Sequence, residues 1–275
     1  MKILVISRHF PPLQSARALQ IGKVIAALEQ AGCNVRVVAG VPTSLAGKVS
    51  DNGSSAKYVV DYVPFGDVKP VRNLAAKVVQ RLRDDFTSVN LNSRWVCQTS
   101  QKALDVLRED PPDVLMTVFT PIESHMVGLA LCAQLSIPWV ASFSDPWPPF
   151  LRPAPYAPRR LPVIPLLQRH LLRRILRQCH AIHVPTVYAA PVLQRGSDSD
   201  LTGRVWAIPH VGPDVWPHVS ALVEGPQYIA HIGHLTHHRV CPELLEAIRI
   251  AVHTMPDRVA GLLCVGDVCR EFKDL

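Results

Sequence analysis

His125 and Asp145 are the two residues whose types and positions first indicate that they could take part in catalysis. Residues 114–119 and 138–143 are short, continuous apolar runs, which are typical of buried parallel strands. His125 lies between the two runs, and Asp145 follows the second one. Because open α/β sheets bind their ligands beyond the carboxyl ends of the strands, we expect both side chains near one rim of a sheet.

The segment between these two runs predicts a helix that begins at Thr120. Thr120 can cap the helix, and Glu123 completes a capping box with it. His125 then lies one turn into the helix. Two simpler interpretations stay open, since His125 can be a polar residue at a domain interface and Asp145 can merely initiate the turn at the following proline.

A second candidate site precedes the helix predicted to begin at Pro242. Gly233 would let a ligand approach the backbone, and Arg239 could hold a phosphate with its planar guanidinium, with His234 between them. The usual nucleotide motifs are missing, because the chain has neither a G-x-G-x-x-G after its first strand nor a G-x-x-x-x-G-K-[ST]. Four histidines near this stretch lack a cysteine or carboxylate partner, and no metal site is predicted there.

The elements that must position these residues alternate between strands and helices, which predicts an α/β fold with a parallel sheet. Strands are expected at 2–7, 35–39, 58–63, 114–119, 138–143, 181–185 and 205–209. Helices are expected at 16–31, 95–107, 166–178 and 188–194, with a further helical pattern after residue 72. Gly32 is placed to end the first helix.

A second, shorter unit follows a segment that is interrupted by glycine, proline and tryptophan. Strands at 228–232 and 261–265 and a helix at 242–253 give the start of a second Rossmann-like domain. We therefore expect an N-terminal Rossmann-like domain at 1–212, a linker at 213–226 and a partial C-terminal domain at 227–275.

Composition describes a globular protein without an obvious targeting segment. Hydrophobic residues make up 48% of the chain, yet no run is long enough to span a bilayer, and residues 1–7 read as a strand rather than a signal peptide. The seven cysteines are scattered and include no C-x-x-C pair, which indicates free thiols in a reducing cytoplasm.

The net charge of +7 comes from one segment. Residues 147–196 contain no Asp or Glu but carry arginines at 152, 159, 160, 169, 173, 174, 177 and 195. Three interpretations are open: a solvated helix face, a nucleic-acid surface, or an anionic membrane surface. No basic motif interleaved with aromatic residues supports nucleic acid.

The membrane interpretation rests on helical spacing. Its apolar residues are Leu161, Ile164, Leu167, Leu171 and Ile175, and its basic residues are Arg169, Arg173, Arg174 and Arg177.

Several motifs in this order resemble the family-4 glycosyltransferases of the two-Rossmann-domain class, GT-B, especially those that make bacterial surface polysaccharides. The matching stretches are Phe10-Pro11-Pro12, Thr120-Pro121 with His125, Phe143-Ser144-Asp145-Pro146-Trp147, Ile208-Pro209-His210-Val211-Gly212, Gly233-His234-Leu235 with Arg239, and Pro242-Glu243-Leu244-Leu245-Glu246-Ala247.

The resemblance implies transfer of a sugar, with retention and without an obligatory metal, in a cleft between an acceptor-side domain and a nucleotide-sugar domain. Gly233 and Arg239 would then lie by the donor diphosphate, where Arg239 would stabilise the leaving group. His125 would lie near the reacting sugar. Gln14 and Ser15 would form an acceptor-side loop.

The chain departs from the family pattern at several positions. Gln14 and Ser15 stand where paired glycines are common, Ser144 replaces an arginine and His210 replaces an asparagine. The family's pair of glutamates that holds the donor sugar and ribose is absent up to Leu275. The C-terminal domain is therefore expected to be truncated, and the 275-residue chain alone to be inactive or nearly so.

The predicted function is glycosyl transfer from a nucleotide sugar to a lipid-linked or polysaccharide precursor, without a cofactor and without nucleic acid. The expected location is the cytoplasm, with peripheral attachment to the inner face of the membrane. Two alternatives remain: a non-catalytic remnant that binds a sugar or a partner, and a sugar-nucleotide epimerase on the same fold.

Overall fold

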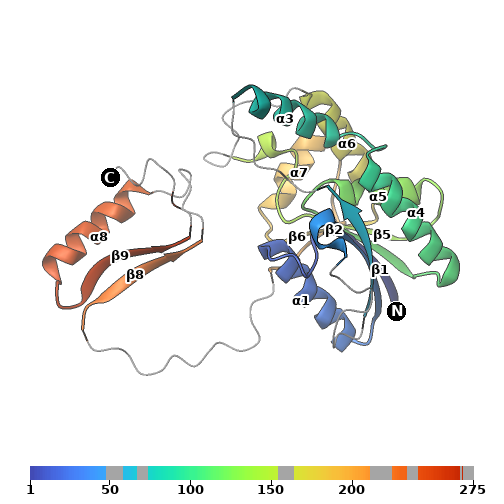
Figure 1. The fold of residues 1–275 in the computed structure, drawn as a ribbon. Helices are drawn as coiled ribbons and strands as arrows, with labels where there is room; N and C mark the ends of the chain where they lie inside the picture. Colours follow the sequence, from blue (N-terminus) through green and yellow to red (C-terminus); the bar gives the residue numbers. More distant parts are fainter. Residues whose placement is uncertain are drawn as a thin grey trace. The chain divides into compact units, whose positions relative to one another are not determined.

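The computed structural model describes residues 1–47, 58–66, 74–153, 164–210, 225–233, 241–266 and 268. The chain divides into two compact units, Met1–Gly212 and Pro213–Leu275 (Figure 1).

The first unit is built on a seven-stranded sheet in which every neighbouring pair of strands is parallel. The order is β3-β2-β1-β4-β5-β6-β7. The strands are β1 (Lys2–Ser7), β2 (Asn34–Pro42), β3 (Val59–Phe65), β4 (Val114–Val118), β5 (Trp139–Ser142), β6 (Ala181–Val184) and β7 (Val205–Ala207). This arrangement confirms the predicted Rossmann-like α/β architecture.

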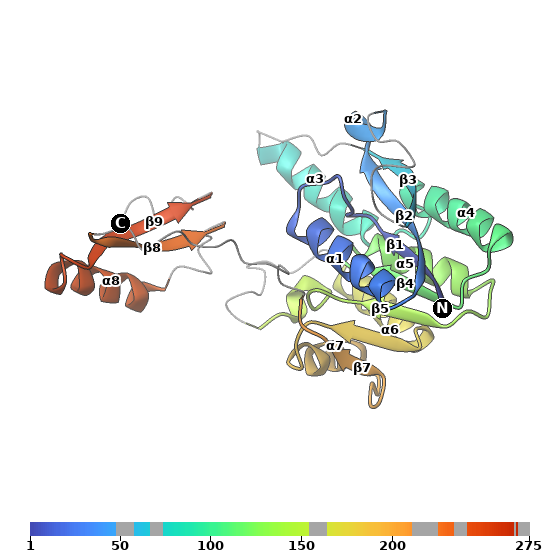
Figure 2. The same cartoon turned by 90° about the horizontal axis from the view of Figure 1, so that it is seen from below.

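Helices cover both faces of this sheet, as a parallel sheet requires (Figures 1 and 2). They are α1 (Ala16–Gln30), α2 (Thr43–Ala46), α3 (Leu74–Thr87), α4 (Arg94–Glu109), α5 (Glu123–Cys132), α6 (Pro165–Gln178) and α7 (Ala189–Ser197), with a 3-10 turn η1 (Pro149–Leu151). Alternate residues of β1 pack into different clusters. Val5 packs with Ile25 of α1, whereas Leu4 packs in the cluster that holds Met126 of α5.

Helix α1 ends at Gly32 as its sequence predicts. Gly32 has a positive φ of 84°, and the amides of Gly32 and Cys33 donate to the carbonyl oxygens of Glu29 and Leu28 at 2.9 and 3.0 Å.

The start of α5 differs from the expectation. The helix begins at Glu123, its N-cap residue is Ile122, and no side chain caps it, so the predicted capping box of Thr120 and Glu123 is wrong. Glu123 instead forms an ion pair with Arg8, which follows β1, and the Arg8 amide donates to Ser124 Oγ at 3.1 Å. Burial raises the pKa of Glu123, and the charge of Arg8 opposes this shift. These contacts attach the loop after β1 to the start of α5.

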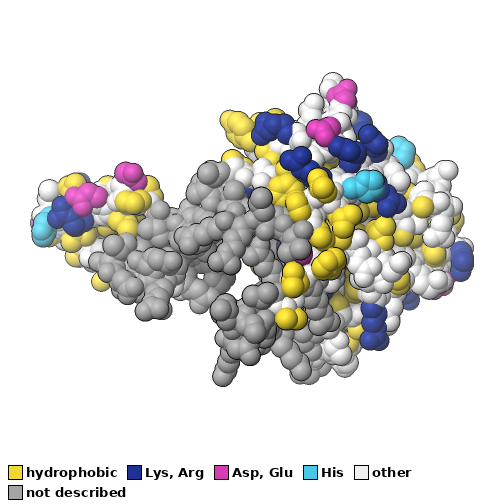
Figure 3. Space-filling model, turned by 90° about the horizontal axis from the view of Figure 1, so that it is seen from above, with side chains coloured by type: hydrophobic (Ala, Val, Ile, Leu, Met, Phe, Trp, Pro, Cys, Tyr) yellow, Lys and Arg dark blue, Asp and Glu magenta, His cyan; other side chains and the backbone are white. Residues whose placement is uncertain are grey.

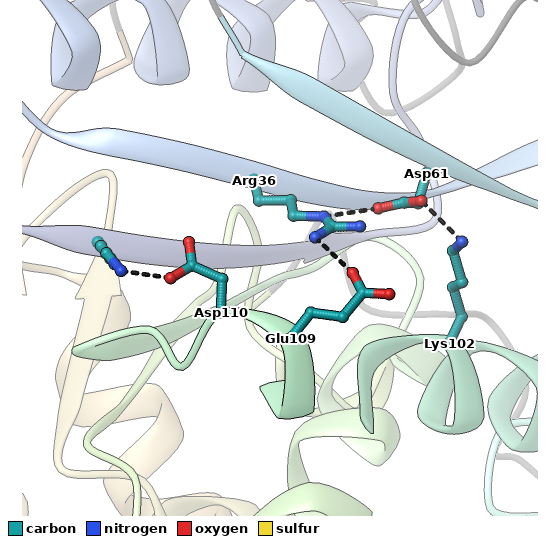
Figure 4. A network of polar contacts seen from close by, with 6 residues as sticks. Arg36, Asp61, Lys102, Glu109 and Asp110 are labelled. Carbon is teal, nitrogen blue, oxygen red and sulfur yellow. Dashed lines mark hydrogen bonds and ion pairs between the residues drawn. The ribbon is translucent and has the colours of Figure 1, made fainter. Parts of the chain in front are cut away.

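A charged network joins β2, β3 and α4 (Figure 4). Asp61 accepts from Arg36 Nε at 2.9 Å and from Lys102 Nζ at 2.8 Å, and Arg36 also contacts Glu109 at 3.2 Å. Burial would raise the pKa of Asp61, but the hydrogen bonds from Lys102 and Arg36 lower it below its ordinary value. Arg36 lies near the start of β2, away from the edge where the strands end. The network therefore holds β2, β3 and α4 together and does not contribute to that edge.

The second unit contains two parallel strands, β8 (Gln227–Ile232) and β9 (Val259–Val265), with α8 (Pro242–Thr254) between them in the chain. This is the predicted strand–helix–strand start of a second Rossmann-like domain. Within the described parts of both units, no helix combines the length and the apolar character needed to cross a membrane.

The contact between α5 and the sheet gives a test of packing. A Cβ atom added at Gly128 would lie 2.5 Å from the ring of Trp139 and 2.9 Å from Thr117 Cγ2. We expect Gly128→Ala to lower the free energy of unfolding by about 1–3 kcal/mol, because the helix must move away from the sheet. Urea denaturation measures the change. Gly47→Ala is the control, since nothing lies within 4 Å of its Cβ position and its φ is −80°. Equal midpoints for the two variants would contradict this packing.

Candidate active site

The loops that follow the parallel strands meet at the carboxyl edge of the sheet in the first unit. The loop after β1 leads to Ser15, which caps α1 by accepting from the amide of Ala18 at 3.1 Å. Ser15 is thus occupied as a helix cap, while its neighbour Gln14 is exposed. Of the two predicted acceptor-side residues, Gln14 is the one whose side chain is available to a ligand.

Asp145 lies at this edge, as its position after β5 predicted. Its side chain is exposed and accepts a hydrogen bond from Ser144 Oγ at 3.2 Å. Ser144 is also 3.4 Å from Thr120 Oγ1, so the turns after β4 and β5 are joined. The carboxylate is positioned on an ordered turn and accessible to a ligand.

Arg17, in the first turn of α1, is a residue that the sequence analysis missed. Its side chain is partly buried, its Nη2 donates to Ser142 Oγ at 3.3 Å, and its Nε is buried without a hydrogen-bond partner. Burial lowers the pKa of Arg17 to about 10, and the charge of Asp145 opposes this shift. The guanidinium stays positive at neutral pH, and no carboxylate among the described residues forms an ion pair with it.

A chain of hydrogen bonds continues from Arg17 across β5 and β6. Ser142 Oγ lies 2.8 Å from His183 Nδ1, and His183 Nε2 lies 3.0 Å from the carbonyl oxygen of Ile208. Because a carbonyl only accepts, Nε2 carries the proton and Nδ1 accepts from Ser142. Burial lowers the pKa of His183, a shift that the Ile208 carbonyl opposes and the charge of Arg17 reinforces, so the ring is neutral.

His125 is fully buried rather than exposed at the rim. Its Nδ1 lies 2.6 Å from Thr117 Oγ1, which also accepts from Trp139 Nε1 at 2.8 Å. The rings of Phe119, Phe143 and Trp139 surround the imidazole, and its Nε2 has no partner. The structure therefore does not bring His125 into an open site with Asp145, and its catalytic role stays a prediction.

The second unit contains Gly233, one of the residues predicted for the donor site. Gly233, directly after β8, has a φ of 124°, and its amide donates to the carbonyl oxygen of Val265 at 2.8 Å. A Cβ atom at Gly266 would lie 2.4 Å from the Gly233 oxygen, so only glycine fits there. The glycines approach each other where β8 and β9 end. The predicted donor residues His234 and Arg239 lie outside the described residues.

The four predicted membrane-surface arginines have different roles. Arg173 donates to the Ser197 carbonyl oxygen at 2.9 Å and pairs with Asp198 at 2.6 Å, so it holds α6 to the end of α7. Arg169 lies over the ring of Phe150, at 5.7 Å from its centroid. Arg177 is exposed and Arg174 partly buried.

The predicted apolar stripe on this helix is wrong in part. Leu171 and Ile175 are 4% and 0% exposed and belong to the core, because α6 packs that face on the sheet. Leu167 is 52% exposed and is joined on the outer surface by Leu166 at 78%.

Comparison with models of protein families shows the family to which the chain belongs. The model described as Glycosyltransferase Family 4 matches residues 20–210, which is more than half of the chain. The chain belongs to glycosyltransferase family 4. The matched residues include Asp145, Ser142 and His183, which lie at or near the carboxyl edge of the sheet in the first unit. A search of the curated proteins finds no match.

Solved structures share the fold of this family-4 chain at low sequence identity. Arabidopsis thaliana UGT89C1 complexed with UDP-L-rhamnose has a TM-score of 0.51 and 11% identity, covering 98% of this chain and 70% of that one. Anabaena Alr3699/HepE in complex with UDP and glucose has a TM-score of 0.50 and 13% identity, covering 100% and 63%.

A putative UDP-N-acetylglucosamine 2-epimerase from Listeria monocytogenes has a TM-score of 0.48 and 15% identity, with 96% of this chain and 61% of that one covered. The family-4 chain therefore spans about two thirds of the length of these solved structures.

The burial of His125 predicts a specific acid sensitivity. Burial lowers the pKa of His125 to about 3, and the charge of Arg17 adds to this shift. In the unfolded protein the imidazole binds a proton below about pH 6.5, while the folded protein does not until about pH 3. Stability contributed by the neutral ring is therefore complete above pH 6.5 and declines as the pH falls toward 3, by at most about 1.4 kcal/mol per pH unit.

Urea denaturation at pH 7.5 and pH 5.0 tests this assignment. We expect His125→Gln, which can still hydrogen-bond to Thr117, to lose less stability between the two pH values than the wild type does. His170→Gln, on the exposed side of α6, should keep the wild-type difference. The same loss in both variants would show that His125 does not carry the effect.

Proposed function

We propose that this protein is a glycosyltransferase that moves a sugar from a nucleotide-sugar donor to an acceptor, with retention at the anomeric carbon. The observation that carries the proposal is the family-4 match over residues 20–210. The fold likeness to UGT89C1 and HepE, solved with UDP-L-rhamnose and with UDP and glucose, supports a nucleotide sugar as donor. The first unit takes the acceptor, and the second unit takes the donor.

The donor diphosphate is assigned to the segment that follows β8. Gly233 has no side chain, and nothing lies within 4 Å of its Cβ position, so a ligand can approach this turn closely. Arg239 would pair with the diphosphate and stabilise the charge that develops on the leaving group, and His234 would line the same loop.

The acceptor side is assigned to the carboxyl edge of the first sheet. Asp145 is exposed on an ordered turn and can accept a hydrogen bond from a sugar hydroxyl. Gln14 can contact the acceptor from the loop before α1. His125 would act only if the aromatic rings around it uncover its Nε2, which the fully buried position makes a demanding requirement.

Two other functions predict different products. An epimerase would convert the nucleotide sugar to an isomer without any acceptor. A non-catalytic remnant would bind a sugar and release nothing. A glycosyltransferase releases nucleoside diphosphate only when an acceptor is present, whereas neither an epimerase nor a remnant releases it, so acceptor-dependent nucleotide release identifies the transferase. Formation of an isomeric nucleotide sugar then separates the epimerase from the remnant.

The acceptor is proposed to be lipid-linked, because the first unit has an apolar and basic surface over α3 and α6 (Figure 3). Its exposed hydrophobic residues are Val79, Leu82 and Phe86 of α3 and Leu166 and Leu167 of α6. Arg169 and Arg177 are exposed on α6. Apolar side chains flanked by arginines suit the headgroup region of an anionic membrane, which gives a peripheral location at the inner face.

The donor assignment predicts an effect of Arg239 on diphosphate binding. We expect Arg239→Ala to weaken UDP binding, measured by titration calorimetry, about tenfold or more, because a charge-assisted contact to phosphate is lost. Uridine should bind both forms equally. Arg249→Ala is the matched control, since Arg249 pairs with Glu246 on the exposed side of α8. Unchanged UDP binding in Arg239→Ala would remove Arg239 from the donor site.

The membrane assignment predicts a charge-reversal effect. We expect the double variant Arg169→Glu and Arg177→Glu to bind phosphatidylglycerol vesicles at low salt about one to two orders of magnitude more weakly than the wild type. Arg173 is left intact because it holds α7. The control is Arg94→Glu with Arg108→Glu, two exposed positions on α4. If the wild type ignores anionic vesicles in co-sedimentation, or if both double variants bind alike, the membrane surface is ruled out.

A further inference from the structure

The first unit contains a cavity of about 340 Å³ that is lined by residues of α1 and of the strands β4, β5 and β6. This volume lies at the lower end of the range of small-molecule sites, roughly 300–1,000 Å³. One wall is the inner side of α1, and the other is formed by strand residues and by residues 208–210 that follow β7. Asp145 does not line the cavity, although its charge acts on the lining residues Arg17 and His210.

The two ends of this cavity differ in chemistry. Most of the lining is apolar and comes from Ile21, Val24, Ala27, Leu28, Met116 and Val140. The polar lining residues are Gln20 of α1 and, grouped at the other end, Arg17, Ser142, His183 and His210. A ligand that fills it needs an apolar body and one polar end.

The polar end is positively charged. Arg17 is its cation, with one hydrogen bond to Ser142 and a buried Nε that has no partner. The charge of Asp145 acts on Arg17, yet the burial of the guanidinium outweighs it, and no ion pair within the described residues neutralises it. A buried cation without a paired anion is costly, so an anionic group from a ligand is favoured there.

The neighbouring histidines do not compete for that anion as cations. The pKa of His183 is lowered by burial and by the charge of Arg17, and the pKa of His210 is lowered for the same reasons. His183 already donates its Nε2 proton to Ile208 and accepts from Ser142, so both ring nitrogens are used. Arg17 is thus the residue that must recognise the charged end.

We propose that this cavity binds a single-chain amphiphile whose anionic head, such as a phosphate, lies against Arg17 and whose hydrocarbon chain lies along α1. The apolar wall supplies the hydrophobic contribution, and the guanidinium of Arg17, whose buried Nε has no partner, supplies the charge and a hydrogen bond to the head. A free phosphate ion uses only the polar end. A neutral amphiphile uses only the apolar end.

Binding of dodecyl phosphate, below the concentration at which it forms micelles, tests the proposal by titration calorimetry. We expect the wild type to bind dodecyl phosphate at least about tenfold more tightly than either inorganic phosphate or dodecyl maltoside. Arg17→Gln should weaken dodecyl phosphate binding about tenfold or more, while Arg17→Lys should keep part of it. Lys23→Gln, on α1 but outside the lining, should change nothing.

A second pair of variants tests the apolar wall without touching Arg17. Ala27 lines the cavity and Ala26 does not, and both are exposed on α1, so the substitutions are matched. We expect Ala27→Trp to block dodecyl phosphate binding and Ala26→Trp to leave it unchanged. This pair decides the question if Arg17→Gln does not fold.

The proposal is overturned if the wild type does not bind dodecyl phosphate, if dodecyl maltoside or inorganic phosphate binds as tightly, or if both Trp variants bind alike. None of these measurements uses a nucleotide sugar, so their outcome is independent of glycosyl transfer.

Discussion

The parallel arrangement of all seven strands is the constraint on which the first unit depends. Every strand ends at the same edge of the sheet, so the turns after β1, β4, β5 and β6 meet there without any further device. A parallel sheet also needs cover on both faces. The helices α4, α5 and α6 pack on one face in the larger core cluster, and α1 packs on the other with β1, β2 and β3. Beside α1 the same face leaves Met116 and Val140 at the wall of a cavity.

Two arginines near this edge, Arg8 and Arg17, differ in whether a carboxylate is paired with them. Arg8 is paired with Glu123 and lies over the rings of Phe65 and Trp95, so its charge is used to fix a loop. Arg17 has no such carboxylate in the described residues, and its charge lowers the pKa of His9, His125 and His183 together with burial. Two arginines nine positions apart in the chain thus differ, because Arg8 is paired with a carboxylate and Arg17 is not paired with one among the described residues.

The sequence alone was sufficient to predict the strands, the helices and the family, because hydrophobic periodicity and turn residues are local properties of the chain. The expected helices 16–31 and 166–178 correspond to α1 and α6 within one residue at each end. Burial of particular side chains could not be predicted in the same way. His125 is one turn from an exposed edge, but three aromatic rings close over it: Trp139 of β5, Phe143 directly after β5, and Phe119 directly after β4. The failed capping box at Thr120 has a similar cause, since a partner distant in the chain, Arg8, takes Glu123.

The sequence did offer one signal that Arg17 is a candidate binding residue. An arginine in the first turn of a helix is unfavourable for the helix dipole, and no acidic residue is present in the first turn of α1 to offset it. A cation at that position, directly after the loop of the first strand, is therefore a candidate for binding rather than for helix stability. The same reasoning separates the arginines of α6. Arg173 pairs with Asp198 and donates to the carbonyl of Ser197, whereas Arg169 and Arg177 form no ion pair with a carboxylate of the described residues. A basic segment without acidic residues thus contains arginines of distinct kinds, and the partner of each decides which of them is available to a ligand or a membrane.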